Sequence, residues 1–411
     1  MQTQISDRYR DTPLGQEADA ILRACVHCGF CTATCPTYQL LSDELDGPRG
    51  RIYLIKQVLE GQAPTPKTQS HLDRCLSCRS CETTCPSGVR YGRLVDIGRE
   101  LVEREVPRSP LEGMKRQALR WIVPHPTRFA PLVQLGRLAR PLLPASMACK
   151  VPPTQAPLPE SAPAADARRT MLVLAGCAQS VATPRTNAAA AQVLASLGIR
   201  LVAAPAAGCC GAVSHHLAAP DEALGFVRRN IDAWWPSIEA GAEAIVVTAS
   251  GCGVMVKDYG HLLRHDTAYA DKAHRVSELA RDLSEVVRAE SLPRERFRPD
   301  LPRVAFHSPC TLQHGQRLNG VVEGILVRAG FTLTQVADPH LCCGSAGTYS
   351  ILQPRLAAQL RDDKLAALQG PAPDLIATAN VGCQLHLGGT AQVPVRHWIE
   401  LLAEYMVPTD G

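Results

Sequence analysis

The C-terminal part of the chain alternates between short apolar runs and longer amphipathic segments. The apolar runs at 171–176 and 244–248 predict buried strands, and the periodic segment 221–239 ahead of the second run predicts a helix. A similar alternation follows residue 300, with predicted strands at 304–306 and 375–378. Strands that alternate with helices in this way are typical of an α/β domain.

The alternation occurs twice, which indicates an internal repeat. The first copy is predicted to contain, in chain order, strand 171–176, helix 186–197, strand 199–204, helix 221–239 and strand 244–248. The second copy is predicted to contain strand 304–306, helix 316–328, strand 331–336, helix 354–368 and strand 375–378. The region is therefore expected to fold as two copies of one α/β unit.

Cysteines stand at matching places in the two copies. Each copy has one cysteine after its first strand, a Cys-Cys-Gly triplet after its second and one cysteine after its third: Cys177, Cys209, Cys210 and Cys252, then Cys310, Cys342, Cys343 and Cys383. The first cysteine precedes the pair by 32 positions in both copies, 177 to 209 and 310 to 342. Because α/β proteins place ligands at the carboxyl ends of their strands, each set is expected to converge as a redox or cluster site.

The first hundred residues have a different pattern, in which short helical stretches separate two groups of cysteines. A helix is predicted at 50–59, between the groups. Residues 101–150 are basic and apolar, and 151–170 contain five prolines and many alanines, as in a semi-rigid linker. The predicted domains are a two-cluster helical ferredoxin domain at 1–105, a basic helical segment with a Pro/Ala-rich linker at 106–170, and Cys-Cys-Gly α/β repeats at 171–290 and 291–411.

Cysteine content is the feature of the composition that bears most on function. The 411 residues include 17 cysteines, of which eight lie in the N-terminal groups, eight lie in the repeats, and Cys149 is given no role. The amino terminus lacks the apolar stretch of a secretory signal, so the thiols are expected to be metal ligands or redox groups rather than disulfides. No apolar run reaches about 18 residues, so no membrane-spanning helix is predicted. A net charge of +4 and an aromatic content of 4% argue against nucleic-acid binding.

The N-terminal cysteines follow the spacing C-x-x-C-x-x-C-x-x-x-C-P twice. The two runs are Cys25, Cys28, Cys31 and Cys35, and Cys75, Cys78, Cys81 and Cys85. This spacing is the bacterial pattern for two [4Fe–4S] clusters, in which the fourth cysteine of each run ligates the other cluster. Cys25, Cys28, Cys31 and Cys85 are therefore expected to bind one cluster. Cys75, Cys78, Cys81 and Cys35 are expected to bind the other. Zinc is the alternative metal, but tetrahedral zinc has no use for the third cysteine in register.

The overall pattern predicts an α+β multidomain protein, with an α-helical two-[4Fe–4S] ferredoxin domain followed by a tandem-repeat α/β Cys-Cys-Gly domain. Arg49 and Arg51 are expected to be solvated surface residues rather than residues that tune cluster charge. Several histidines near the cysteines are expected to be ordinary loop residues: His27, His215, His216, His307 and His314.

The twin cysteine runs and the twin Cys-Cys-Gly repeats resemble a known family over nearly the whole length of the chain. That family is the iron–sulfur subunit of bacterial glycolate oxidase (glycolate dehydrogenase), within the twin-ferredoxin plus Cys-Cys-Gly repeat group. The segments that carry the resemblance are CVHCGFCTATCPTY at 25–38, LDGPRGRIYLI at 45–55 and CLSCRSCETTCPSGVRYGR at 75–93.

The resemblance implies an electron-transfer subunit that is not catalytic alone. In this family a separate FAD-containing subunit oxidises glycolate, a 2-hydroxy acid, and the iron–sulfur subunit passes the electrons singly toward quinone. The implied cofactors are two [4Fe–4S] clusters, with one or two further clusters possible in the repeats. The implied partners are FAD-containing oxidase subunits in a hetero-oligomer, cytoplasmic and peripheral on the cytoplasmic membrane. The sequence has no G-x-G-x-x-G after a strand, which agrees with a flavin held by the partner.

The repeats leave alternatives open. Heterodisulfide-reductase-type repeats end in C-x-x-C, whereas these repeats end in single cysteines, Cys252 and Cys383. Four thiols suffice for one [4Fe–4S] cluster or a redox-active thiol pair, and inert buried cysteines are the remaining interpretation. The alternative functions are a heterodisulfide-reductase-like catalytic subunit and the equivalent subunit of a lactate or glycerol-3-phosphate dehydrogenase. The basic segment 107–150 is expected to dock on a flavin subunit, to rest on anionic lipid or to cover the protein's own core.

Overall fold

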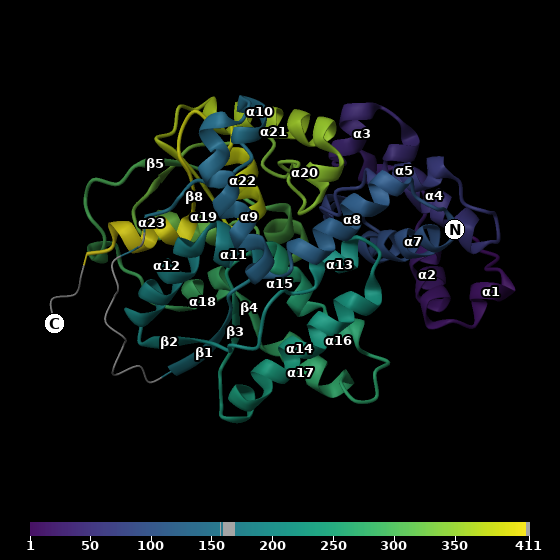
Figure 1. The fold of residues 1–411 in the computed structure, drawn as a ribbon, viewed down its shortest axis with the longest axis horizontal. Helices are drawn as coiled ribbons and strands as arrows, with labels where there is room; N and C mark the ends of the chain where they lie inside the picture. The colour runs from purple at the N-terminus through teal and green to yellow at the C-terminus, as the bar shows by residue number, and fades with distance from the viewer. Residues whose placement is uncertain (157, 159–168, 408–411) are drawn as a thin grey trace. The chain divides into compact units, whose positions relative to one another are not determined.

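The computed structural model describes residues 1–156, 158 and 169–407 (Figure 1). The chain forms two compact units, each assembled from segments that are separate in the sequence. The first unit comprises Met1–Ala118, Ser214–Pro220 and His340–Lys364. The second comprises the described parts of Leu119–Val213, Asp221–Pro339 and Leu365–Gly411. Part of the linker predicted at 151–170 lies outside the described residues.

The first unit opens with short helices around an apolar core. In chain order these are α1 (Asp7–Arg10), α2 (Pro13–Ala24), η1 (Phe30–Thr32), α3 (Pro36–Leu41), η2 (Glu44–Asp46), α4 (Pro48–Leu59), α5 (Pro66–Asp73), α6 (Ser80–Thr84) and α7 (Tyr91–Glu105). The helix predicted at 50–59 is confirmed as α4. Pro48 suits its first position, because a backbone N–H there would have no partner within the helix. Gly98 lets α7 lie close to α4, since a Cβ at this position would be 2.5 Å from Ile55 Cγ1.

Later parts of the chain add α20 (Tyr349–Leu352) and most of α21 (Pro354–Gln369) to the first unit, together with the end of α13 (Ala212–His216). The basic segment forms α8 (Pro110–Ile122), α9 (Pro126–Ala139), η3 (Arg140–Leu142) and α10 (Ala145–Ala148). Among the residues that the structure describes, no helix has the length and apolar character needed to cross a bilayer.

The second unit contains two four-stranded parallel sheets with the same strand order. The first sheet has the order β2-β1-β3-β4, with β1 (Arg169–Leu174), β2 (Ile199–Ala203), β3 (Ile245–Val247) and β4 (Ala280–Asp282). The second has the order β6-β5-β7-β8, with β5 (Arg303–His307), β6 (Thr332–Leu333), β7 (Leu375–Thr378) and β8 (Val395–His397). In each sheet the first strand of the repeat is central. The internal repeat predicted from the sequence is therefore confirmed as a repeated topology.

Helices connect the parallel strands, as the alternating pattern predicts. The connections include α11 (Cys177–Ala182), α12 (Pro184–Ala195), α14 (Pro220–Glu239), α15 (Ser250–Lys257), α16 (Tyr259–Leu262), α17 (Ala270–Leu279), α18 (Leu283–Ala289), η4 (Arg294–Arg296), η5 (Thr311–Gly315), α19 (Val321–Arg328) and α22 (Val381–Gly388). The helix α23 (Trp398–Tyr405) follows the last strand, β8. The helix predicted at 316–328 begins only at Val321, because Thr311–Gly315 form a separate π turn and Gly320 adopts φ 75°. The strand predicted at 331–336 contains only Thr332 and Leu333.

Candidate metal centres

Both N-terminal cysteine runs adopt the same tight loop. In each run the residues two and four positions after the first cysteine have left-handed backbone: His27 and Gly29 with φ 58° and 85°, and Ser77 and Arg79 with φ 52° and 59°. Left-handed residues in such loops turn successive N–H groups toward one concave side. The Ser77 N–H donates to Cys75 Sγ over 3.4 Å. The loops therefore present both thiols and backbone donors to the space that they enclose.

The thiols of the two runs form two sets that exchange their fourth cysteines. One cavity is lined by a first set consisting of Cys25, Cys28, Cys31 and Cys85. Cys81 also borders this cavity, but its thiol interacts electrostatically with those of Cys78, Cys75 and Cys35, which together make a second set. We place Cys81 in the second set because the thiols that raise its pKa most are those of Cys78, Cys75 and Cys35. This grouping of sulfur atoms is the one that the crossed pattern requires.

The two sets suit iron–sulfur clusters by their donors and by their surroundings. Apolar residues such as Ile52, Val89 and Pro86 line the first cavity beside the thiols. Burial, followed by the neighbouring Cys25, raises the pKa of Cys31 to about 11. Burial, followed by the other thiols of its set, also raises the pKa of Cys81. Closely spaced buried thiols are poor acids alone, and iron that replaces their protons would stabilise them as thiolates.

A buried arginine lies beside the second set. The Arg51 side chain is 1% exposed, and its guanidinium donates to His71 O over 2.7 Å and to Thr37 Oγ1 over 3.2 Å. Thr37 Oγ1 is in turn 3.4 Å from Cys35 Sγ. Burial of the guanidinium acts to lower the pKa of Arg51. The neighbouring Tyr91, Cys75, Cys35 and Asp46 act to raise it by more, so the pKa of Arg51 is raised overall.

The expectation of a solvated surface is therefore wrong for Arg51. It holds only in part for Arg49, whose side chain is 38% exposed and pairs with Glu44 over 2.6 Å but also lines the cavity of the first set. The two residues differ because they lie two positions apart on α4, and so on opposite faces of the helix. Arg51 was missed although it shares a stripe with the apolar residues Ile55, Val58 and Leu59.

Two further side chains hold the loop of the second set. The Tyr91 hydroxyl donates to Cys75 Sγ over 3.6 Å. Arg99 donates to Cys75 O over 2.6 Å and to Ser77 Oγ over 2.8 Å. Such outer contacts orient metal-ligating side chains and adjust the charge around them.

The cysteines of the first repeat converge at the carboxyl ends of adjacent strands. Cys177 follows β1, the Cys209–Cys210 pair follows β2, and Cys252 follows β3. Their thiols form a chain of hydrogen bonds from Cys177 to Cys209, Cys210 and Cys252. The hydrogen bond with Cys209, followed by burial, raises the pKa of Cys177. The convergence predicted for this set is therefore present.

The surroundings of this set are largely hydrogen-bonded. Gly211 has φ 92°, and its N–H donates to Cys209 Sγ over 3.4 Å. Asn230 Nδ2 donates to Cys209 O over 2.8 Å, and the Tyr259 hydroxyl donates to Cys210 O over 2.9 Å. Among the described residues no cysteine is in a disulfide, so all four thiols are available to a metal.

The second repeat reproduces the geometry of the Cys-Cys-Gly triplet. Gly344 has φ 85°, and its N–H donates to Cys342 Sγ over 3.4 Å, as in the first repeat. This triplet belongs to the first unit, whereas Cys310, after β5, and Cys383, in α22, belong to the second. The triplet geometry is thus a local property of the sequence that both repeats share.

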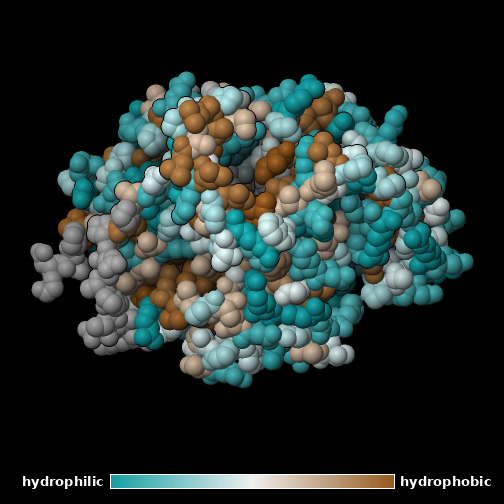
Figure 2. Space-filling model, viewed as in Figure 1, coloured by the Kyte–Doolittle hydropathy of each residue, from teal (hydrophilic) through white to brown (hydrophobic). Residues whose placement is uncertain are grey.

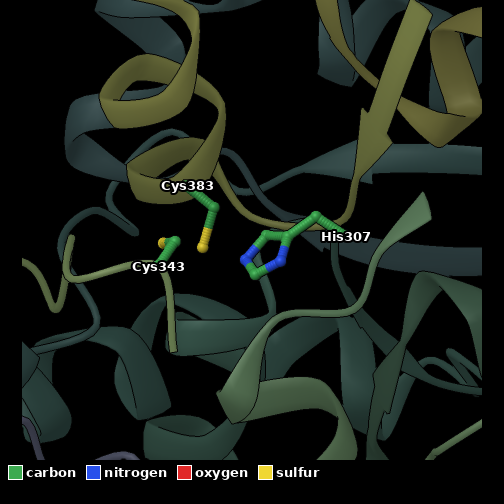
Figure 3. A group of neighbouring side chains, drawn as sticks. All are labelled: His307, Cys343 and Cys383. Carbon is green, nitrogen blue, oxygen red and sulfur yellow. The ribbon is translucent and has the colours of Figure 1, made fainter. Parts of the chain in front are cut away.

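His307, expected to be an ordinary loop residue, is instead the buried last residue of β5. Its imidazole and the Cys383 thiol point toward one another, with ligand atoms within 4.8 Å (Figure 3, where Cys343 is also drawn). The first repeat has Leu174 at the corresponding place, three positions before the first cysteine. This substitution of an imidazole for an apolar side chain was the signal that set His307 apart from the other histidines.

Two sets of four thiols in a helical domain, followed by two α/β repeats with cysteines at their strand ends, define an iron–sulfur electron-transfer protein. Comparison with known families supports this class. Residues 21–89 match the 4Fe-4S dicluster domain, and residues 171–257 and 304–388 each match the Cysteine-rich domain.

Known relatives identify the family within this class. The chain is 58% identical to the glycolate oxidase iron-sulfur subunit of Escherichia coli K12, over 98% of this chain and 99% of the relative. It is 29% identical to a probable glycolate oxidase iron-sulfur subunit of Bacillus subtilis 168, over 92% and 93%. A lactate utilization protein A of Bacillus licheniformis is 29% identical over 47% of this chain and 82% of that protein. The chain belongs to the family of glycolate oxidase iron–sulfur subunits, which confirms the resemblance and the fold class, and with them the role of electron-transfer subunit of an oxidoreductase.

Proposed function

We propose that this chain carries electrons, one at a time, from an FAD-containing subunit that oxidises glycolate toward quinone. The observation that carries the proposal is the presence of two thiol sets within one helical unit. The ligands of the two [4Fe–4S] clusters would be Cys25, Cys28, Cys31 and Cys85, and Cys75, Cys78, Cys81 and Cys35. The clusters supply one-electron redox chemistry, and the chain's own residues fix their positions and their electrostatic surroundings.

The first set is the better placed of the two to exchange electrons with a partner. Cys28 is exposed at the rim of its cavity, whereas Cys75 and Cys81 of the second set are buried. Val26 and Phe30, on either side of Cys28, are 67% and 62% exposed. Exposed apolar side chains around a redox site favour close contact with another protein.

We propose further that each Cys-Cys-Gly set is an additional redox site, either a cluster or a redox-active thiol pair. These sets are Cys177, Cys209, Cys210 and Cys252, and Cys310, Cys342, Cys343 and Cys383. The thiol chain of the first repeat and the matching triplet geometry of the second support this assignment. Iron determination would test it, because two clusters account for about eight irons per chain and each further [4Fe–4S] cluster adds about four.

The proposed setting is a hetero-oligomer with FAD-containing oxidase subunits, peripheral on the cytoplasmic membrane. The name of the Escherichia coli relative supports glycolate as the substrate of the complex. The name of the Bacillus licheniformis relative keeps lactate as the second candidate. A heterodisulfide-reductase-like activity is less well supported, because each repeat ends in a single cysteine.

The experiment is to assay dye reduction by the anaerobically purified chain, alone and co-expressed with FAD-containing partner subunits. Glycolate, lactate and glycerol 3-phosphate are compared as substrates. The chain alone should be inactive, and the complex should reduce dye and quinone with glycolate. Cys25→Ser and Cys75→Ser should lower that activity, whereas Cys149→Ser, outside all four sets, should not. Glycolate oxidation by the isolated chain, or full quinone reduction by a complex that lacks it, would contradict the proposal.

A further inference from the structure

Two histidines and a carboxylate meet in the first unit, away from the thiol sets. His215 and His216 are the last residues of α13, and Asp96 lies on α7. His215 Nε2 is 3.3 Å from Asp96 Oδ2, and His216 Nδ1 is 3.3 Å from Asp96 Oδ1. The imidazole rings are 5.3 Å apart at an interplanar angle of 63°. Both rings are therefore turned toward the same carboxylate.

The spacing of these atoms is long for direct hydrogen bonds and also fits ligands around one metal ion. An N–H donor and an oxygen acceptor are usually about 2.9 Å apart, so 3.3 Å is long for both contacts. Histidine nitrogen and carboxylate oxygen bind zinc at about 2.0 to 2.2 Å, and tetrahedral geometry then separates two ligand atoms by about 3.4 Å. One ligand atom from each of the three side chains lies within 4.8 Å of the others.

The charge around the group leaves room for a cation. Arg99 Nη1 is 3.9 Å from Asp96 Oδ1, too far for a hydrogen bond, and Arg108 and Arg116, which border the same hollow as His216, are paired with Asp73. The guanidinium of Arg99 is instead directed to Ser77 Oγ, Leu72 O and Cys75 O. The His216 side chain is 41% exposed, so an ion could enter from solvent on that side.

We propose that Asp96, His215 and His216 bind a divalent transition-metal ion, with zinc as the representative ion. Two imidazoles and one carboxylate are a common set of three protein ligands for such ions, and they leave a fourth position for water. The ion would fasten the segment Ser214–Pro220, which follows the first Cys-Cys-Gly triplet, to α7. That segment contains Ala218 with φ 56°, a left-handed conformation that a non-glycine residue keeps only when its surroundings hold it.

The test is equilibrium dialysis of the full-length, anaerobically purified, iron-loaded chain against Zn²⁺ after treatment with EDTA. Zinc and iron per chain are measured in the same sample. The wild type should bind one zinc per chain more than the double variant His215→Asn/His216→Asn, at equal iron content. His274→Asn is the matched control, because His274 is 73% exposed and also adjoins a carboxylate, Glu278, over 3.6 Å. This control should bind as much zinc as the wild type.

X-ray absorption at the zinc edge distinguishes this site from zinc in the thiol sets. The proposed site gives only nitrogen and oxygen neighbours near 2.0 Å, whereas thiolates give sulfur near 2.3 Å. Equal zinc in the wild type and the double variant, or a sulfur shell around the extra zinc, would overturn the proposal. If the double variant fails to retain iron, Asp96→Asn is measured in the same way, and undiminished zinc in that variant would also overturn it. The outcome is independent of the glycolate-linked activity.

Discussion

Arg51 places a positive charge beside the second thiol set, at a position that solvent does not reach. A guanidinium remains protonated in proteins, so its burial must be compensated by hydrogen bonds and by anionic neighbours. Asp46 is one such neighbour, 3.4 Å from Arg51 Nη2, and it is also contacted by Arg74 over 2.8 Å and by His71 over 3.0 Å. The charge of Arg51 is therefore not cancelled by Asp46 alone. It remains available to stabilise thiolates at Cys35 and Cys75.

Replacing Arg51 with Met removes this charge while keeping most of the side-chain volume. A cation stabilises the more negative, reduced state of a nearby cluster, so we expect one of the two midpoint potentials to fall by tens of millivolts. The free energy of unfolding should fall by about 3 kcal/mol, since a buried ion pair is broken. Potentiometric titration followed by electron paramagnetic resonance measures the potentials, and anaerobic urea unfolding measures the stability.

The matched control for Arg51→Met is Arg23→Met. Arg23 is 60% exposed and pairs with Asp19 over 2.7 Å on the surface of α2. This variant should leave both potentials unchanged and alter stability by less than about 1 kcal/mol. Unchanged potentials in an iron-replete Arg51→Met protein would show that the buried charge does not reach the second set.

Residue-level prediction succeeded where spacing alone determines chemistry. The crossed grouping of the eight N-terminal cysteines follows from a spacing pattern, and the sulfur atoms are grouped accordingly. Arg51 and His307 were harder to interpret, because charged and polar residues are usually exposed. In both cases the information was positional: Arg51 lies on the apolar stripe of α4, and His307 replaces Leu174 of the other repeat. The Asp96–His215 contact joins residues 119 positions apart, which no local pattern reveals.

At the level of elements, the central strands of both sheets and the edge strand β2 were predicted, whereas the edge strands β4 and β8 were not. β1, β3 and β7 are apolar runs buried along most of their length, as central parallel strands are. The edge strands β4 and β8 contain only three residues each, and each includes an arginine. The edge strand β6 has only two residues where a strand at 331–336 was predicted. Short, mixed edge strands carry too little periodicity to be recognised.

The junction between β8 and α23 depends on one buried imidazole. His397 Nδ1 accepts a hydrogen bond from Ile399 N over 3.3 Å and caps α23, while Nε2 donates to Thr248 O over 3.0 Å. Burial lowers the pKa of His397 to about 3, although hydrogen bonds to the backbone of Thr248 and Ala379 favour the protonated ring. The ring is therefore neutral in the folded protein, whereas in the unfolded chain it takes up a proton below its ordinary pKa of 6.5.

The pKa of His397 predicts a loss of stability in acid. Because the folded-state pKa is lowered, the contribution to stability is complete above pH 6.5 and declines toward pH 3 by about 1.4 kcal/mol per pH unit. Between pH 7.5 and 5.5 the wild type should lose about 1.4 kcal/mol more than His397→Asn, in which Asn keeps a capping oxygen but does not titrate. Anaerobic urea unfolding of both proteins at the two pH values measures this difference.

The wild type and His397→Asn contain the same clusters, so any effect of acid on the clusters cancels in the difference between the two proteins. His274→Asn, on an exposed surface, should follow the wild type at both pH values. If the free energy of unfolding falls equally with pH in the wild type and in His397→Asn, protonation of the buried His397 ring is not the cause of the loss of stability.

For the whole molecule, the question is which surface meets the partner subunits. α9 packs against α11 and buries Val133, so one side of the basic segment does cover the protein's own fold. Its other side is apolar and exposed, with Leu135, Leu138 and Leu142 between 62% and 87% accessible. Figure 2 shows hydrophobic atoms gathered over α9 and α10. The sequence has no acidic residue between Glu112 and Glu160, so this surface is also positively charged.

An apolar, cationic surface of this kind is suited to an interface with an acidic partner or to anionic lipid. The composition of the segment revealed both properties, but only the fold shows which leucines are exposed and which side of α9 is buried. A partner subunit is the occupant we predict, because an electron carrier must be held close to its electron donor. Binding to lipid is the competing outcome, and it can be measured separately.

Replacing Leu135, Leu138 and Leu142 together with Ser should weaken assembly with the FAD-containing subunits without unfolding the chain. Each side chain is exposed, so iron content and the melting temperature of the isolated chain should remain close to wild type. Loss of the apolar contacts should lower co-purification of the FAD-containing subunits at least tenfold, which corresponds to about 1.4 kcal/mol of binding free energy. Val327→Ser, at an exposed apolar position outside the segment, should leave co-purification unchanged. If the triple variant assembles normally but no longer binds vesicles of anionic lipid, the surface is a membrane contact and the partner docks elsewhere.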